Sequence, residues 1–293
     1  MGCSGFIAIS GITMDLESLT DILFALVLFL YALSTIWYLS FVAFQKKFLA
    51  QIGGGQLWAG FICHFILILV TYFRIGHIPA HNLQYCLSLT VWALVAVYLF
   101  FQFSLNIRIL GAIVTPLSTL VLTFAFCLPR PDFVISKQFE SIWVSVHVIT
   151  SFIGNGAFAL AACVGIFYLI QEKAIKGKRR GFFYNRLPAL ESLDQMGYAC
   201  IAIGFPMLTI GIMTGCIYAQ LHWGHYWNWD PKEVWSAMTW LFYAAILHGR
   251  MALGWRGRRL AYLAIIGIFL VLFTFLGVNF LLKGHHGDFT KFK

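Results

Sequence analysis

The sequence predicts an all-α fold: a polytopic membrane helical bundle of about eight transmembrane helices, with residues 1–293 forming a single membrane domain. The chain is 60% hydrophobic and only 11% charged, so a water-soluble fold would lack the polar surface to cover its core. Apolar runs of about twenty residues, long enough to cross the hydrocarbon of a bilayer, recur along the whole chain. The intervals between them are too short to hold a soluble domain.

Each predicted span is an apolar run that ends where charged residues, glycine or proline interrupt it. The third and fourth spans are nearly continuous, because only a short polar break separates them. In chain order we predict spans at residues 20–44, 57–76, 86–105, 107–127, 142–171, 195–220, 234–250 and 260–282.

The basic residues predict the orientation of these spans. With eight passes, one face holds most of the lysines and arginines of the short loops, and that face should be cytoplasmic. Both termini then lie on the outer side, and the acidic segment before the first span argues against a cleaved signal peptide. The net charge of +9 therefore reflects topology and predicts no nucleic-acid partner. The basic residues assigned to the inner face are Lys46, Lys47, Arg108, Lys173, Lys176, Lys178, Arg179, Arg180, Arg186, Arg250, Arg256, Arg258 and Arg259.

The cysteines form no metal or redox motif. The sequence contains seven cysteines but no Cys-x-x-Cys pair, so we interpret most of them as small buried hydrophobic residues. The chain also lacks Cys-x-x-Cys-His, the attachment site of c-type haem. Any haem bound here is expected to be held without thioether bonds.

A tryptophan-rich external loop, residues 221–234 between the sixth and seventh spans, is the strongest functional signal. Aromatic surface at a membrane face suits a flat, hydrophobic, metal-bearing ligand such as haem. Tryptophans commonly anchor proteins at the membrane interface, but their crowding into one short polar loop favours ligand binding here. Asp230 and Glu233 are expected either to orient an imidazole or a loop amide, or to cap the following helix. The candidate binding residues of the loop are Trp223, Gly224, Trp227, Trp229 and Asp230.

The histidines fall into two groups at different depths. His64 and His248 lie inside spans, in the half nearer the cytoplasm, where an ionisable side chain has a functional or a helix-bridging role. The others lie toward the outer face, among them His147 at the start of the fifth span and His285 and His286 after the eighth. Two groups of imidazoles predict two iron-binding stations.

Four motifs follow one another in the second half of the chain. They are Arg-Leu-Pro-Ala-Leu-Glu-Ser-Leu-Asp at 186–194, Gly-Phe-Pro at 204–206, Trp-Gly-His-Tyr-Trp-Asn-Trp-Asp-Pro-Lys-Glu-Val-Trp-Ser at 223–236 and Leu-His-Gly-Arg at 247–250. In this order they resemble the CcsA family, also called ResC, of system II cytochrome c biogenesis proteins. This family belongs to the haem-handling superfamily that is named for its tryptophan-rich WWD domain. Shorter matches at residues 76–83, 147–148 and 278–286 extend the resemblance over nearly the whole chain.

The resemblance implies a ligand set for non-covalently bound haem b, the substrate and cargo. His147 and His286 match the two histidines that ligate haem iron on the outer face, with His285 as the alternative to His286. His248 matches a ligand that holds haem within the membrane. Its opposing ligand comes from a CcsB- or ResB-like partner in the family, and His64 is the alternative within this chain.

Two short segments depart from the family pattern. The family usually has Asn-Leu-Tyr-Glu-Ser where this chain has Asn-Leu-Gln-Tyr-Cys at 82–86. Near the C-terminus, the usual Gly-Leu-His-Ser-Tyr is replaced by Gly-His-His-Gly-Asp at 284–288, which is why His285 competes with His286.

We therefore expect the chain to be the haem-handling and presenting subunit of a membrane cytochrome c synthase. Acting with its membrane partner and possible thiol-reducing proteins, such a complex exports haem and attaches it to the Cys-x-x-Cys-His segment of apocytochrome c. The alternatives are a b-type haem electron carrier between quinone and an external acceptor, and a helical scaffold that only docks a partner. The expected location is the bacterial inner membrane, ahead of the plastid thylakoid, because no transit peptide precedes the first span.

Overall fold

The computed structural model of the chain describes residues 7–9, 12–14, 16–105, 108–128, 140–178 and 186–281, and these residues are almost entirely helical. The short elements are the strands β1 (Ile7–Ile9) and β2 (Ile12–Met14), the 3₁₀ turn η1 (Arg108–Leu110) and the π-helical turn η3 (Phe273–Gly277). The α-helices are α1 (Leu16–Phe44), α2 (Lys47–Ile75), α3 (Leu83–Leu105), α4 (Gly111–Cys127), α5 (Ile142–Lys176), α6 (Leu190–Trp223), α7 (Pro231–Ala252), α8 (Arg258–Leu272) and α9 (Val278–Leu281).

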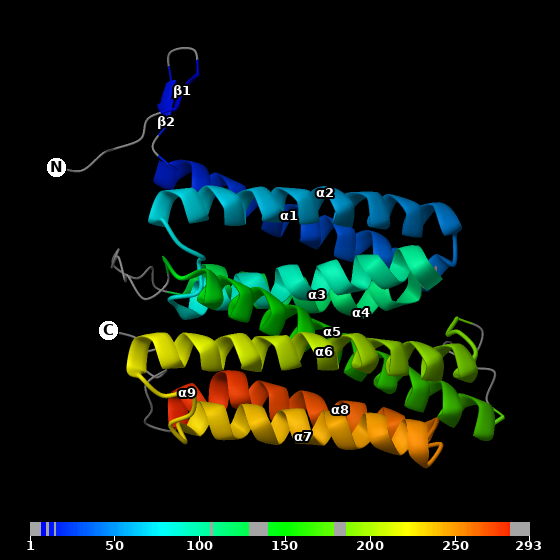
Figure 1. The fold of residues 1–293 in the computed structure, drawn as a ribbon. Helices are drawn as coiled ribbons and strands as arrows, with labels where there is room; N and C mark the ends of the chain where they lie inside the picture. Colours follow the sequence, from blue (N-terminus) through cyan, green and yellow to red (C-terminus); the bar gives the residue numbers. More distant parts are fainter. Residues whose placement is uncertain are drawn as a thin grey trace.

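The helices confirm a polytopic helical bundle. Among the described residues, seven helical stretches are long and apolar enough to cross a membrane, and each overlaps one predicted span. The remaining predicted span, 234–250, corresponds to α7, which is less apolar than the others because it carries charged and hydroxyl side chains. Nevertheless α7 runs alongside α8 through the same layer of the bundle (Figure 1).

The chain passes back and forth between two ends of the bundle. The start of α1, the α2–α3 link, the α6–α7 link and α9 all lie at one end (Figure 1). The α1–α2 and α7–α8 links, the end of α5 and the start of α6 lie at the opposite end (Figure 1). These segments carry basic residues of the predicted inner face, among them Lys46, Lys173 and Arg256. This alternation agrees with the predicted topology, and we call the two ends outer and inner accordingly.

α5 is the central helix, packing against α6 along most of its length and also against α3 and α8. Small residues allow this close approach, as is common between helices in membranes. A Cβ atom added to Gly154 of α5 would lie 3.1 Å from the carbonyl oxygen of Gly204 in α6. The two backbones are therefore nearly in contact, which fixes how α6 sits over α5.

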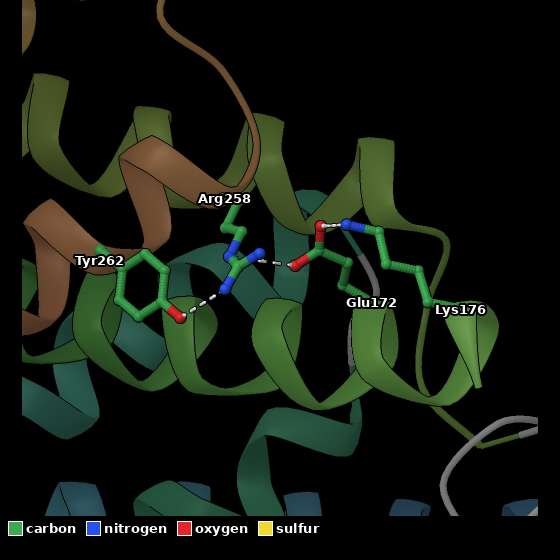
Figure 2. Close-up of polar contacts among 4 residues, drawn as sticks. All are labelled: Glu172, Lys176, Arg258 and Tyr262. Atoms are coloured by element: carbon green, nitrogen blue, oxygen red, sulfur yellow. Dashed lines mark hydrogen bonds and ion pairs between the residues drawn. The ribbon is translucent and has the colours of Figure 1, made fainter.

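Polar contacts tie the helices together at the inner end. Figure 2 shows the Glu172 carboxylate of α5 between Lys176 of the same helix, at 2.6 Å, and Arg258 of α8, at 3.8 Å. A more buried pair joins Asp194 of α6 to Arg250 of α7 at 2.8 Å. The Asp194 carboxylate also accepts a hydrogen bond from the backbone N–H of Gly257. These contacts connect α6 to both helices that follow it.

The structure departs from the sequence prediction in two local features. β1 and β2 form a short antiparallel hairpin before α1, which the all-α prediction did not include. α6 continues to Trp223, and α7 begins at Pro231, so the irregular part of the predicted 221–234 loop is shorter, residues 224–230. The aromatic segment is therefore anchored closely at both ends.

Candidate functional site

The outer half of the bundle contains a cavity of about 240 Å³. Residues of α3, α5, α6, α7, α8 and η3 form its walls, and the segment between α6 and α7 contributes to its lining. Most of the lining is apolar or aromatic, with a few polar groups, which is the usual composition of a site for a small organic ligand. Two free cysteines, Cys86 and Cys216, also face this cavity.

His147 of α5 is the imidazole of the cavity wall. Its Nδ1 lies 2.6 Å from the carbonyl oxygen of Gly211 in α6. Because a carbonyl oxygen only accepts hydrogen bonds, Nδ1 carries the proton, and in a neutral ring Nε2 keeps the lone pair. Metal-ligating histidines are commonly held in this way, by a carbonyl that fixes the tautomer and the ring orientation. The ring therefore fits a haem iron ligand.

The tryptophan-rich segment contributes aromatic side chains to the same cavity. Trp223, Tyr226 and Trp227 line it, whereas Trp229 is 78% exposed and does not. Trp227 and Trp229 meet edge to face with their ring centroids 6.0 Å apart. The sequence thus predicted the aromatic part of the lining, but the structure separates Trp229 from it.

The other two candidate residues of the loop determine backbone geometry. Gly224 ends α6 in the left-handed conformation, with φ of 78°, which glycine adopts without a Cβ penalty. Asp230 is the N-cap of α7, and its carboxylate accepts a hydrogen bond from the backbone N–H of Lys232. Of the two roles considered for Asp230, helix capping is the one present in the structure.

Glu233 completes the cap and fixes the loop. Its Oε2 accepts hydrogen bonds from the backbone N–H groups of Asn228, at 2.8 Å, and Asp230, at 3.2 Å. This reciprocal arrangement is a capping box, and here it also orders the residue next to Trp227 and Trp229. The aromatic side chains are thereby held over the cavity by a rigid backbone.

A π-helical turn, η3, forms another part of the wall. Thr274 and Phe275 of this turn line the cavity, and Thr274 hydrogen-bonds to Thr239 of α7 at 3.0 Å. Single π turns interrupt helices frequently at functional sites. The turn was not predicted, since the apolar sequence of this span shows no break that would mark it.

Four predicted histidine ligands lie away from this cavity or outside the described residues. His248 is exposed on the side of α7 and does not line the cavity. His64 is fully buried and uses both ring nitrogens, Nε2 with Ser88 at 2.8 Å and Nδ1 with Tyr31 at 3.3 Å. This is the helix-bridging role that was considered for a histidine within a span. His285 and His286 lie outside the described residues.

A second cluster of polar residues lies at the outer end, around the α2–α3 link. Arg74 donates to the hydroxyls of Thr20, at 3.0 Å, and Tyr85, at 2.9 Å. The His81 ring contacts the rings of His77 and Tyr85, with centroids 5.1 Å apart in both cases. Burial, together with the nearby His77 and Arg74, lowers the pKa of His81 to about 4.

Sequence reasoning did not single out Lys232, which also lines the cavity. The sequence places Lys232 on the outer face and within the motif at 223–236, but no role was assigned to it. The available signal was its position two residues after Asp230 in the motif that ends the aromatic segment.

Comparison with known proteins identifies the family. The model of the family described as cytochrome C assembly protein matches residues 80–286. The chain is 33% identical over 274 residues to the cytochrome c biogenesis protein CcsA of Guillardia theta, covering 87% of this chain and 91% of that protein. It is 32% identical over 291 residues to CcsA of Synechococcus elongatus, covering 84% and 90%. CcsA of Chlamydomonas reinhardtii is 36% identical over 230 residues, covering 75% and 64%.

A solved structure supports the fold independently. The chain superposes on the cytochrome c haem lyase CcmF with a TM-score of 0.65 and 16% identity. The match covers 97% of this chain but half of that larger protein. At this identity the likeness concerns the fold alone. The sequence matches decide the assignment: the chain belongs to the CcsA family of cytochrome c assembly proteins, and it is a multi-pass membrane protein.

Proposed function

We propose that this chain is the haem-handling and presenting subunit of a membrane cytochrome c synthase, with haem b as its non-covalently bound cargo. The observation that carries the proposal is the position of His147. This imidazole, in the tautomer that leaves Nε2 as the metal-binding atom, lines an apolar cavity beneath Trp223 and Trp227. An aromatic and apolar cavity with one oriented imidazole suits an iron porphyrin better than a polar substrate.

The residues of the cavity would bind and orient the porphyrin. His147 would ligate the iron, and the aromatic side chains would supply flat contact surface on the ring. The haem supplies the vinyl groups that become joined to the two cysteine thiols of apocytochrome c. A rigid loop contributes mainly by positioning, because two correctly oriented reactants avoid much of the entropy cost of a bimolecular encounter.

The second external ligand is proposed to be His286, with His285 as the alternative. In the sequence both follow α9, a helix that lies at the outer end of the bundle after the π turn that lines the cavity. With two histidines on the iron, both axial positions are occupied, which limits reaction with oxygen and adjusts the reduction potential.

His248 supports a second station that is shared with a partner. Its side chain is exposed on a face of α7 that also carries Met238, Leu241 and Met251. A haem ligated there would need its other axial ligand from outside this chain, in agreement with a CcsB- or ResB-like membrane partner. Apocytochrome c and thiol-reducing proteins complete the proposed set of partners, and the bacterial inner membrane is the proposed location.

The external site is tested by purifying the chain with its partner from haem-replete cells and recording the haem spectrum. We expect His147→Ala and His286→Ala each to lower bound haem and cytochrome c maturation by at least tenfold. His222→Ala is the matched control, because His222 lies at the outer end of α6, stacked on Tyr218, without lining the cavity. Unchanged haem content and maturation in the His147 and His286 variants would contradict the proposal. Rapid reduction by quinol, with normal c-type cytochromes in a deletion strain, would favour the electron carrier instead.

A further inference from the structure

The cavity holds two oppositely charged side chains, Lys232 and Glu233, next to each other in the first turn of α7. The Glu233 carboxylate is already bound to two backbone N–H groups of the loop. The Asp230 carboxylate caps the helix through the backbone N–H of Lys232, at 2.9 Å. Both nearby acids therefore serve the backbone of this turn.

The Lys232 ammonium has the Asp230 carboxylate as a charged neighbour within the described part of the chain. No hydrogen bond or ion pair joins it to another described residue, although its side chain is partly buried. A charged group in apolar surroundings is costly unless an opposite charge approaches it. The walls around Lys232 are largely apolar, and Asp230 also caps the helix. An anionic ligand would therefore provide the direct charge pair that Lys232 does not form with the described residues.

The position of Lys232 is fixed by its neighbours rather than by its own side chain. Pro231 restricts the backbone at the first position of the helix, and the capping box holds the next turn. The start of a helix of this length adds partial positive charge at the same place. Lysine is well suited to meet an anion there as a point charge.

Among the described residues, the other lysine or arginine at this end of the bundle is Arg74. Its two terminal nitrogens donate to Thr20 and Tyr85, and the residue does not line the cavity. Among the described cations of the outer end, Lys232 is the one whose side chain lines this site.

We propose that Lys232 is the anion-binding residue of the cavity and receives a propionate carboxylate of the porphyrin. This inference rests on the proposed function and adds a specific contact to it. With the carboxylate held at the start of α7 and the iron at His147 of α5, the porphyrin would have a defined orientation in its plane.

The test separates carboxylate recognition from iron ligation by using iron-free ligands. The full-length chain in detergent is titrated with protoporphyrin IX and with its dimethyl ester, and binding is followed by quenching of tryptophan fluorescence. We expect the wild type to bind the diacid about tenfold more tightly than the ester, the range of one charge-assisted hydrogen bond. Lys232→Gln should bind both ligands equally, with affinity for the ester unchanged, and Lys232→Arg should keep most of the preference.

The control variant is Lys176→Gln, which removes a lysine at the inner end, paired with Glu172 (Figure 2). It should retain the wild-type preference for the diacid. The proposal is overturned if Lys232→Gln keeps that preference, or if the wild type does not distinguish the two ligands. Equal ester affinity in all variants verifies that each is folded. Failure of the wild type to bind either porphyrin would instead remove the proposed haem function, and this inference with it.

Discussion

The His147 ring lies against the backbone of α6, and the single residue that allows this contact is Gly215. A Cβ atom added to Gly215 would lie 2.8 Å from Nδ1 of His147 and 3.0 Å from its Cε1. The 2.8 Å contact would force the ring or the helix to shift, because packed atoms do not approach so closely. The orientation of the imidazole therefore depends on the absence of a side chain one helical turn beyond Gly211, whose carbonyl accepts the Nδ1 proton.

Substitution of Gly215 tests the orientation of the His147 ring without removing any of the proposed iron ligands. Gly215→Ala should displace the His147 ring and reduce haem retained on purification by about tenfold, the lower range for loss of a partner that orients a metal ligand. Absorbance of haem per purified chain measures the effect. Gly55→Ala is the control, since a Cβ there meets nothing within 4 Å. Equal haem loss in both variants would argue against a role for the ring orientation.

His81 gives a prediction about pH. Its pKa is lowered from 6.5 to about 4 in the folded chain, so the unfolded chain binds more protons between these values. Stability should therefore fall as the pH decreases from about 6.5 toward 4. In His81→Gln this decrease should be smaller, as measured by thermal unfolding in detergent across that range. The exposed His225→Gln should keep the wild-type pH dependence, and an unchanged slope in His81→Gln would refute the assignment.

Among the elements, the start of α7 connects the aromatic loop to the bundle. The capping box formed by Asp230 and Glu233 would stabilise any helix, but Glu233 also binds the backbone of Asn228. The motif at 223–236, which predicts ligand binding, therefore also contains the residues that start helix α7. The side chains of Trp223 and Trp227 line the cavity. The end of α6 holds the backbone on one side of them, and the capping box of α7 holds it on the other.

Removing the Glu233 carboxylate should loosen this loop. Glu233→Ala leaves the N–H groups of Asn228 and Asp230 without their acceptor and should cost about 1 kcal/mol of stability. Faster amide hydrogen exchange at residues 226–231 should accompany the loss. Glu191→Ala is the comparison, because Glu191 lies in the first turn of α6 and accepts only a long 3.4 Å hydrogen bond from Gln195. Unchanged exchange in the loop would show that Glu233 does not order it.

At the scale of the whole molecule, the two proposed iron stations face in different directions. The cavity with His147 opens within the bundle, and His248 lies on the outside of α7. On the proposed function, the chain by itself would supply the outer site, whereas the inner site would need a ligand from a neighbouring molecule. This division matches a subunit that works in a complex.

If the inner site needs a partner, the number of haems bound per chain should be higher when the partner is present. Co-expression with a CcsB-like protein should add a second bound haem, which His248→Ala removes while haem at the outer site remains. Haem per complex, determined with and without the partner, measures this. The control variant His222→Ala should retain both bound haems. A second haem on the chain expressed without the partner, removed by His248→Ala, would contradict a ligand supplied by the partner.

The sequence by itself determined the spans, their alternation between two ends and the aromatic identity of the site. Apolar runs and flanking charges are sufficient for this, because the cost of placing polar backbone and side chains in hydrocarbon restricts a chain locally. The order of the motifs also identified the family, which the comparisons confirm.

Only the tertiary structure decided which side chains face one another. It turned Trp229 and His248 away from the cavity, paired His64 with Tyr31 and Ser88, and brought Lys232 to the same cavity as His147. The rotation of each helix about its axis is set by close packing at residues such as Gly154 and Gly215, and by the π turn η3. Those contacts join segments far apart in sequence, and a nearly uniform apolar pattern carries no signal for them.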